Sequence, residues 1–186
     1  MSSQTLQTLP ALTLWQPWGS MVALGVKWVE TRSWPTNYRG WLVIHAAKRF
    51  TLEEREICLI WPFDEALKAA GVSMLADLPL GAGLCVARLD AVTPTEACVA
   101  LDKVERSLGN YQPGRYGWVF GEIRSFDEPI PARGYQQMWT WPEPVAVEQL
   151  KKVTRLDVRV RLDVSSPTRL RLTPEASPTR WRPPSP

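Results

Sequence analysis

The chain has 186 residues, of which 45% are hydrophobic and 22% are charged. This is enough for one domain with a buried core and excludes a chain that is disordered throughout. No run of about 18 apolar residues is present, so we expect no membrane-spanning helix and no membrane partner. The first residues lack the basic and apolar stretches of a signal peptide. The formal net charge of +3 is mildly basic, as in many nucleic-acid-binding proteins.

The positive charge is concentrated at the C-terminal end. Residues 1–153 contain 15 basic and 16 acidic side chains, whereas residues 154–186 contain 7 basic and 3 acidic ones. We therefore do not expect the folded part to hold long nucleic acid by bulk electrostatic attraction.

Cysteine and histidine contents limit the possible chemistry. Cys58, Cys85 and Cys98 are an odd number without C-x-x-C spacing, which predicts buried thiols in a reducing cytoplasm and no disulfide framework. His45 is the only histidine, so a site of several histidines is excluded, and a Ser-His-Asp triad would have to use His45. We expect no metal and no cofactor.

The first fifty residues predict short strands joined by a helix and turns. Residues 11–15 and 41–46 are mostly apolar, as in buried strands, and residues 27–32 alternate as in a half-buried strand. A helix should begin near Pro17, which suits the first turn, and end at Gly25.

Helices and strands continue to alternate further along the chain. Thr51 is a suitable N-cap for a helix to about Trp61, and Thr95 for a helix to about Leu108. The other predicted segments are a helix at 63–70, a strand at 80–90, an alternating strand at 116–126 broken by Pro129 and Pro131, a closing loop and strand at 133–141, and an ambiguous helix or strand at 148–162.

These strands and unequal helices do not form regular βαβ units, so we predict an α+β fold with a small curved or barrel-like sheet. The predicted organisation has four parts along the chain. They are an N-terminal extension (1–10), a domain (11–150), an uncertain strand or helix (151–164) and a flexible tail rich in Pro and Arg (165–186).

The densest polar cluster lies between residues 25 and 32. Glu30 and Arg32 share one strand face by the period of two, and Lys27 follows a glycine that can turn it to either side. A lysine, a carboxylate and an arginine that converge can bind an anion or a base, because arginine is a planar donor and glutamate accepts from an exocyclic amine. The alternative is a solvated strand face with ordinary ion pairs.

Tryptophans surround this cluster: five of the ten lie between Trp15 and Trp41. Aromatic faces beside cations suit unpaired bases, and each stacking contact contributes about 1–3 kcal/mol. Trp18 and Trp34 lie beside prolines in turn-like segments, so they are the candidates for exposed stacking. The alternative is that most of these rings belong to the core.

Two further polar residues lie in apolar strands. His45 is either a buried histidine bonded to the backbone or a donor that faces a ligand. Glu122 is either a solvent-facing residue or a general base or base-reading acceptor.

The spacing Gly25-x-Lys27-x-x-Glu30-x-Arg32 resembles the G-x-K-x-x-E-x-R signature of ASCH domains, which belong to the PUA-like superfamily. Segments 12–18, 39–46, 116–120 and 134–139 resemble the flanking parts of the family in the same order. The resemblance extends from about residue 11 to 141. It implies a small β-barrel with surrounding helices, a cleft lined by the signature residues, and an association with RNA and modified nucleobases.

The first hypothesis is a module that binds single-stranded RNA or a modified base or nucleoside. Lys27 and Arg32 would position phosphates or base carbonyls, and Glu30 would read an amine edge. Arginines of the tail would add salt-dependent attraction to phosphates. The predicted ligand-binding residues are Lys27, Glu30, Arg32, Trp18, Trp34, Arg39 and His45.

The second hypothesis is a hydrolase of N4-acylated cytidine nucleosides or of RNA. One branch of similar fold hydrolyses N4-acetylcytidine with a lysine, a threonine three positions later and a glutamate from a later strand. Lys27 matches the lysine, but Glu30 stands in the place of the threonine, so the hydroxyl nucleophile is missing. In an enzyme, Glu30 or Glu122 would activate water and Lys27 would stabilise an oxyanion.

The third hypothesis is an adaptor whose Pro/Arg-rich tail binds a partner protein. Deletion from about Ser165 onward would then abolish the interaction and leave the domain folded.

Overall fold

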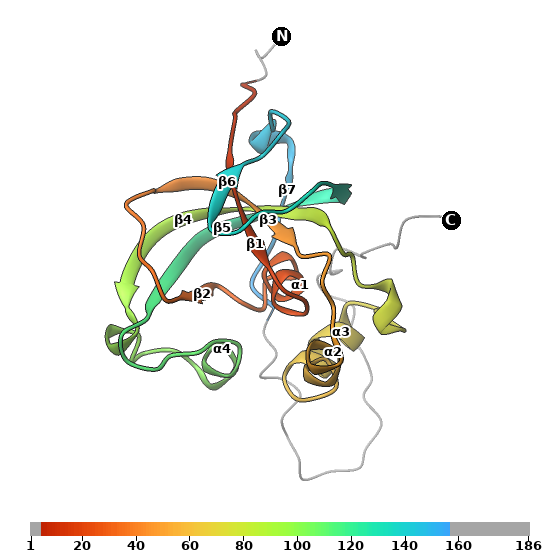
Figure 1. Ribbon diagram of the computed structural model, residues 1–186, viewed down its shortest axis with the longest axis vertical. Helices are drawn as coiled ribbons and strands as arrows, with labels where there is room; N and C mark the ends of the chain where they lie inside the picture. Colours follow the sequence, from red (N-terminus) through yellow and green to blue (C-terminus); the bar gives the residue numbers. More distant parts are fainter. Residues whose placement is uncertain (1–4, 157–186) are drawn as a thin grey trace.

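A curled, mixed β-sheet organises the protein in a computed structural model that describes residues 5–156 (Figure 1). The predicted tail and the last part of the ambiguous 148–162 segment lie outside the described residues. None of the helices formed by residues 5–156 has the length and apolar character that a membrane crossing requires.

Seven strands form this sheet in the described part of the chain. They hydrogen-bond in the order β2-β5-β4-β3-β1-β6, and β7 pairs with β5. The β1–β3 pair is parallel and the other pairs are antiparallel. The strands are β1 (Pro10–Leu14), β2 (Val29–Arg32), β3 (Gly40–Ala46), β4 (Ala82–Pro94), β5 (Tyr116–Pro131), β6 (Met138–Thr140) and β7 (Lys151–Lys152).

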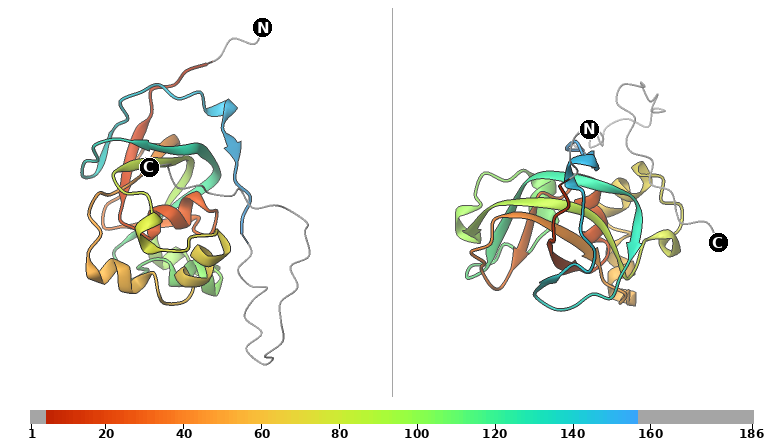
Figure 2. Two further views of the ribbon diagram at one scale, coloured as in Figure 1. Left: turned by 90° about the vertical axis from the view of Figure 1, so that its right-hand side faces the viewer. Right: turned by 90° about the horizontal axis from the view of Figure 1, so that it is seen from above.

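Short helices accompany the sheet. Helix α1 packs against the sheet, and α2 and α3 lie together below it in the view of Figure 1. Figure 2 shows the sheet curling around α1 as a half-barrel. The predicted α+β class with a curved sheet is therefore confirmed. The helices are α1 (Trp18–Ala23), α2 (Leu52–Ile57), α3 (Phe63–Ala69) and α4 (Lys103–Ser107).

The predicted helix start at Thr95 is wrong. Thr95 begins only a 3-10 turn (Thr95–Ala97), because its hydroxyl donates to the carbonyls of Gln112 and Arg115. The α-helix starts eight residues later, where the Asp102 side chain accepts from the N–H of Glu105. The aspartate, and not the threonine, is the helix cap.

Strand β5 runs further than the sequence suggested. It continues through Pro129 and Pro131, and Pro131 faces Ala82 of β4. A proline lacks the N–H of a ladder bond but is tolerated at an unpaired edge. Within residues 5–156, the opposite side of β5 is paired only further back, with β2 and β7, so the prolines interrupt no second ladder.

The apolar side chains form three clusters. One fills the curl of the sheet around Trp118 and Phe120, a second joins α1 to α2, α3 and α4, and a third covers the outer face around Trp141. Residues just outside the predicted 11–150 domain also pack on it: Leu9 is buried in the third cluster and Val153 in the first.

The three cysteines are free and buried, as the sequence predicted. Burial raises the pKa of the Cys58 thiol to about 11, and it raises the pKa of Cys85 and Cys98 as well. These thiols are therefore protonated and unreactive near neutral pH.

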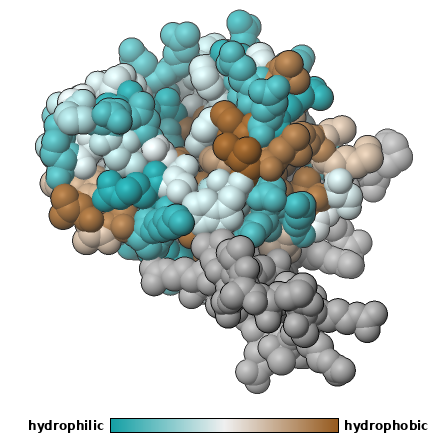
Figure 3. Space-filling view, turned by 90° about the horizontal axis from the view of Figure 1, so that it is seen from below, coloured by the Kyte–Doolittle hydropathy of each residue, from teal (hydrophilic) through white to brown (hydrophobic). Residues whose placement is uncertain are grey.

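The face seen from below carries apolar patches set among hydrophilic side chains (Figure 3). Large apolar side chains that remain exposed on α2 and the segments after it are Leu52, Leu59, Ile60 and Met74.

The burial of Trp118 generates a first prediction. Trp118 is fully buried, so Trp118→Ala should lower the free energy of unfolding by about 3–5 kcal/mol through lost contacts and an unfilled cavity. Trp15 is 50% exposed, so the matched Trp15→Ala change should cost less than about 1 kcal/mol. Denaturant unfolding monitored by circular dichroism measures both, and equal costs would contradict the assignment of Trp118 to the core.

Candidate functional site

Lys27 lies in the turn between α1 and β2 and is completely buried. Its Nζ donates to the carbonyl of Val29 at 2.6 Å and to that of Leu108 at 2.9 Å, and lies 3.4 Å from Oε2 of Glu30. An ammonium group has three hydrogens, and these three partners match them. Lys27 is therefore held in one position and has no donor to spare.

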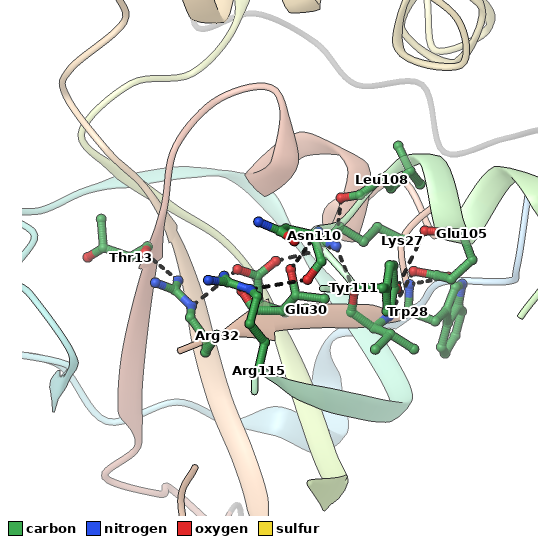
Figure 4. Close-up of polar contacts among 12 residues, drawn as sticks. Thr13, Lys27, Trp28, Glu30, Arg32, Glu105, Leu108, Asn110, Tyr111 and Arg115 are labelled. Carbon is green, nitrogen blue, oxygen red and sulfur yellow. Dashed lines mark hydrogen bonds and ion pairs between the residues drawn. The ribbon is translucent and has the colours of Figure 1, made fainter. Parts of the chain in front are cut away.

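Glu30 lies between two cations (Figure 4). Its Oε2 faces Lys27, and its Oε1 lies 3.1 Å from Nε of Arg32. The sequence predicted that Glu30 and Arg32 share a face, and their contact agrees with that. Side-chain exposure rises from 0% at Lys27 through 11% at Glu30 to 23% at Arg32, so the row leads from the interior to the surface.

Arg32 also links β2, the first strand in the sheet order, to β1, the last but one. Its Nη2 donates to the carbonyl of Thr13 at 2.9 Å. Thr13 lies on β1 beyond Leu12, the last residue that pairs with β6, so this carbonyl is on an edge without a strand partner. Because β2 and β1 stand far apart in the strand order, this contact closes the curl. Nη1 of Arg32 has no hydrogen-bond partner within residues 5–156, so donors remain at the surface.

Glu105 is a second buried carboxylate behind this row. It accepts from the backbone N–H groups of Trp28 and Val29 at 2.8 and 3.0 Å, and from Nη2 of Arg155 at 3.2 Å. Burial raises the pKa of Glu105, and the ammonium of Lys27 opposes this rise. Glu105 thus fixes the chain just before β2 and adds negative charge near Lys27.

The segment after α4 binds to β2 through Thr31. The N–H of Asn110 donates to Oγ1 of Thr31 at 3.0 Å, and Arg115 donates to the carbonyls of Thr31 and Asn110 at 3.2 and 3.1 Å. Arg115 is therefore tied to the backbone of β2 between Glu30 and Arg32 (Figure 4).

Comparison with known proteins identifies the family. A family model of the ASCH domain matches residues 12–154. The chain belongs to the ASCH domain family. ASCH domains are generally thought to bind RNA, and the resemblance seen in the sequence is confirmed.

Solved structures similar to this chain include another ASCH domain. A crystal structure of ASCH from Zymomonas mobilis matches 66% of this chain and 72% of its own, with 13% identity and a TM-score of 0.39. A search of curated proteins finds no match.

The two tryptophans predicted to stack on a ligand both pack against the core of the ASCH domain. Trp34 meets Trp118 edge-on at 4.7 Å, and its carbonyl accepts from Nε1 of Trp118 at 3.3 Å. Trp18 meets Phe63 edge-on at 5.7 Å in the helical cluster. Both are half-buried, whereas Trp15 is 50% exposed and has the Arg49 guanidinium 4.3 Å above its ring.

Within residues 5–156, neither Arg39 nor His45 bonds to Lys27, Glu30 or Arg32. Arg39 is exposed and donates to the carbonyls of Thr36 and Tyr38 in its own loop. His45 is 1% exposed and its Nε2 lies 3.0 Å from the carbonyl of Ala132. Burial lowers the pKa of His45, and the Ala132 contact opposes this shift. His45 thus has the buried, backbone-bonded position that was one of its two predicted alternatives.

Glu122 faces away from Lys27. In the β4–β5 register Leu89 faces Phe120 and Arg88 faces Glu122, so Gly121 is an extra residue on β5. This bulge reverses the alternation and turns Glu122 away from the face of Phe120. Glu122 instead pairs with Arg124 at 2.8 Å and with Arg88 at 3.5 Å. Lys27, Glu30 and Glu122 do not converge.

Two other features bear on which ligands fit. Among residues 5–156, no group of three or more His, Cys, Asp or Glu side chains could hold a metal ion. A hollow of about 340 Å³ opens at the start of β1 and is lined by Thr8, Leu9, Pro10, Tyr38, Met138, Trp139 and Thr140.

The contacts of Glu105 predict a structural role. Glu105→Ala would leave Lys27 with less compensating charge and two buried N–H groups without an acceptor. We expect a loss of about 2 kcal/mol or more in the free energy of unfolding, since each buried N–H left without an acceptor costs about 1–3 kcal/mol. The exposed Glu148 on the opposite side of β5 provides a control, because Glu148→Ala should cost less than about 1 kcal/mol. Denaturant unfolding of both variants would contradict this role if the two costs were equal.

The buried His45 predicts a pH dependence of stability. Its pKa in the folded protein lies below 6.5, so the unfolded chain takes up the proton more readily. Its contribution to stability is therefore full above about pH 6.5 and falls as the pH drops through that value. Thermal unfolding at about pH 7.5 and about pH 5.5 measures this loss. The His45→Gln variant should lose less stability between these two pH values than the unaltered protein. If it loses as much, the pH dependence comes from other groups.

Proposed function

We propose that this ASCH domain binds single-stranded RNA, or a modified base or nucleoside, at Glu30 and Arg32. The observation that carries the proposal is the row of Lys27, Glu30 and Arg32, which is fixed at its buried end and partly exposed at the other. A site of this kind is preorganised, so little side-chain freedom is lost when a ligand binds.

The chemistry of the exposed end suits a nucleobase. Arg32 presents planar N–H donors, which match base carbonyls, ring nitrogens or phosphate oxygens. Glu30 is an acceptor beside these donors, and it has oxygen lone pairs left for an exocyclic amine. An unpaired base displays donors and acceptors side by side on its edge, and such edges are accessible in single-stranded RNA.

The near-neutral charge of residues 1–153 supports recognition of a few nucleotides over attraction to a long duplex. Lys27 supports the site from inside, because its three hydrogens are already used. In the proposal Trp34 and Arg39, on the loop after β2, form the rim, while Trp18 and His45 act only through packing.

A hydrolase receives less support. Lys27 is fully engaged by Val29, Leu108 and Glu30, so it has no donor for an oxyanion. Glu122 lies on another face, and the Thr31 hydroxyl already accepts from Asn110. The adaptor hypothesis concerns the tail, which lies outside the described residues and stays a prediction.

Substitution of the exposed pair tests the proposal. Arg32→Ala and Glu30→Gln should each weaken binding of short single-stranded RNA, or of the nucleoside that binds, by about tenfold or more, since hydrogen bonds to charged groups contribute about 1.5–3 kcal/mol. Fluorescence anisotropy with labelled RNA, and competition by nucleosides, measures the change. Circular dichroism should confirm that both variants are folded.

Lys68→Ala is the matched control, because it removes one positive charge from α3, where the side chain is 73% exposed. Its affinity should equal that of the unaltered protein. The site assignment would be wrong if Arg32→Ala and Glu30→Gln left the affinity unchanged for every ligand bound. If the unaltered protein hydrolyses N4-acetylcytidine and the Glu30→Gln variant does not, the hydrolase is favoured instead.

A further inference from the structure

We infer that the ligand of this ASCH domain is a strand of several unpaired nucleotides, which continues from Arg32 over Trp15 and Tyr135. The inference rests on the proposed function and extends it by a second binding surface. It depends on two exposed aromatic rings, each with an arginine beside it, that lie near the end of β1.

The first ring is Trp15, directly after β1. Because β1 and β3 are parallel, their C-terminal ends lie at the same edge of the sheet, and Arg49, three residues after β3, reaches the ring at 4.3 Å. Arg49 is itself held by the buried carboxylate of Glu54, at 3.3 Å. The guanidinium covers one face of the ring, and the 50% exposure of Trp15 leaves room for a base on the rest.

The second ring is Tyr135, which is 52% exposed. The guanidinium of Arg133 lies 5.5 Å from its ring centre, and Trp139 supports the ring from the side at 5.4 Å. Like Trp15, Tyr135 is an accessible ring with a guanidinium beside it.

Thr13 connects both rings to Arg32. Its carbonyl accepts from Arg32 at 2.9 Å, and its hydroxyl accepts from Nε1 of Trp139 at 3.0 Å. Trp15 follows Thr13 by two residues on the same chain. Thr13 is therefore bonded both to Arg32 and to Trp139, the ring that contacts Tyr135.

Lys48 adds a further cation, directly before Arg49 in the sequence. It is exposed and lies against Gly81, since a Cβ on Gly81 would be 3.6 Å from the Lys48 side chain. Gly81 in turn accepts from the N–H of Ala132 at 2.9 Å, next to Arg133. Lys48 thus lies beside the segment that carries Arg133 and Tyr135.

Cations interleaved with accessible rings are the features that bind single strands, since bases stack on the rings and cations meet the phosphates. The carboxylates within this set are Glu30 and Glu54, and both are already paired with cations. A duplex hides the faces of its bases, and a free nucleoside fills one position only. The arrangement therefore favours an unpaired strand that spans several positions.

Length dependence tests this inference. The unaltered protein should bind single-stranded RNA of about 12 nucleotides at least tenfold more tightly than RNA of about 4 nucleotides. Trp15→Ala and Tyr135→Ala should each weaken binding of the longer RNA by about fivefold or more, the lower limit for one stacked base. Both residues are half exposed, so these variants should fold, which circular dichroism verifies.

Further variants separate stacking from charge. Trp15→Phe and Tyr135→Phe keep a ring and should restore most of the affinity. Arg49→Lys keeps a cation for Glu54 and loses the planar group, so it should weaken binding less than Trp15→Ala. Leu59→Ala, in the turn after α2, removes an exposed apolar side chain and should leave the affinity for both RNAs unchanged.

The outcomes distinguish this inference from the proposed function. If Arg32→Ala weakens binding but the Trp15 and Tyr135 variants bind both lengths normally, the inference is overturned and the proposed function stands. If the Trp15 and Tyr135 variants weaken binding but Arg32→Ala does not, the second surface is real and the Glu30–Arg32 assignment fails. No binding of either RNA would overturn this inference and the RNA part of the proposed function, and binding of nucleosides would then test the remaining part. A single-stranded DNA of equal length that binds as tightly would overturn the choice of RNA.

Discussion

The buried ammonium group of Lys27 is the constraint on which the rest of this ASCH domain depends. A charge in the interior is tolerated only when it is paired and hydrogen-bonded. Here two partners are close in the sequence, the carbonyl of Val29 and the carboxylate of Glu30 on β2, and one is distant, the carbonyl of Leu108 after α4. The need to satisfy one cation therefore fixes β2 against α4, and Glu105 reinforces that attachment through the backbone of Trp28 and Val29.

This constraint separates the roles of the signature residues. Lys27 stabilises the site from the interior, because all three hydrogens of its ammonium group are engaged. Glu30 and Arg32 are partly exposed and have hydrogen-bond acceptors and donors left. In the proposed function, the same Arg32 that bonds to Thr13 also donates to the ligand, so recognition and closure of the sheet would depend on one side chain. Substitutions at Lys27 therefore report on folding before they report on binding, and Arg32 and Glu30 are the more informative positions.

Much of the fold and the centre of the site could be predicted from local patterns. The period of two placed Glu30 and Arg32 on one face, and apolar runs located the strands. The remainder depends on contacts that no local pattern encodes. Glu105 and Arg115 reach β2 across more than 70 residues, and the Gly121 bulge turned Glu122 to another face. The parallel pairing of β1 with β3, which brings Arg49 to Trp15, is also a property of the topology, so neighbouring prolines were a poor guide to which tryptophan is exposed. The sequence did contain one signal that was missed, the Asp102-x-x-Glu105 cap of α4.

The closure at Arg32 has a mechanical consequence. The neighbouring strands of the sheet are joined by ladders of backbone hydrogen bonds, whereas β2 and β1 meet through a guanidinium and a single carbonyl. A side chain can lengthen or rotate this connection without breaking any ladder, so the circumference of the half-barrel can adjust here. A ligand that bonds to Arg32 acts on that adjustable joint, and the width of the opening is then set partly by the molecule that occupies it.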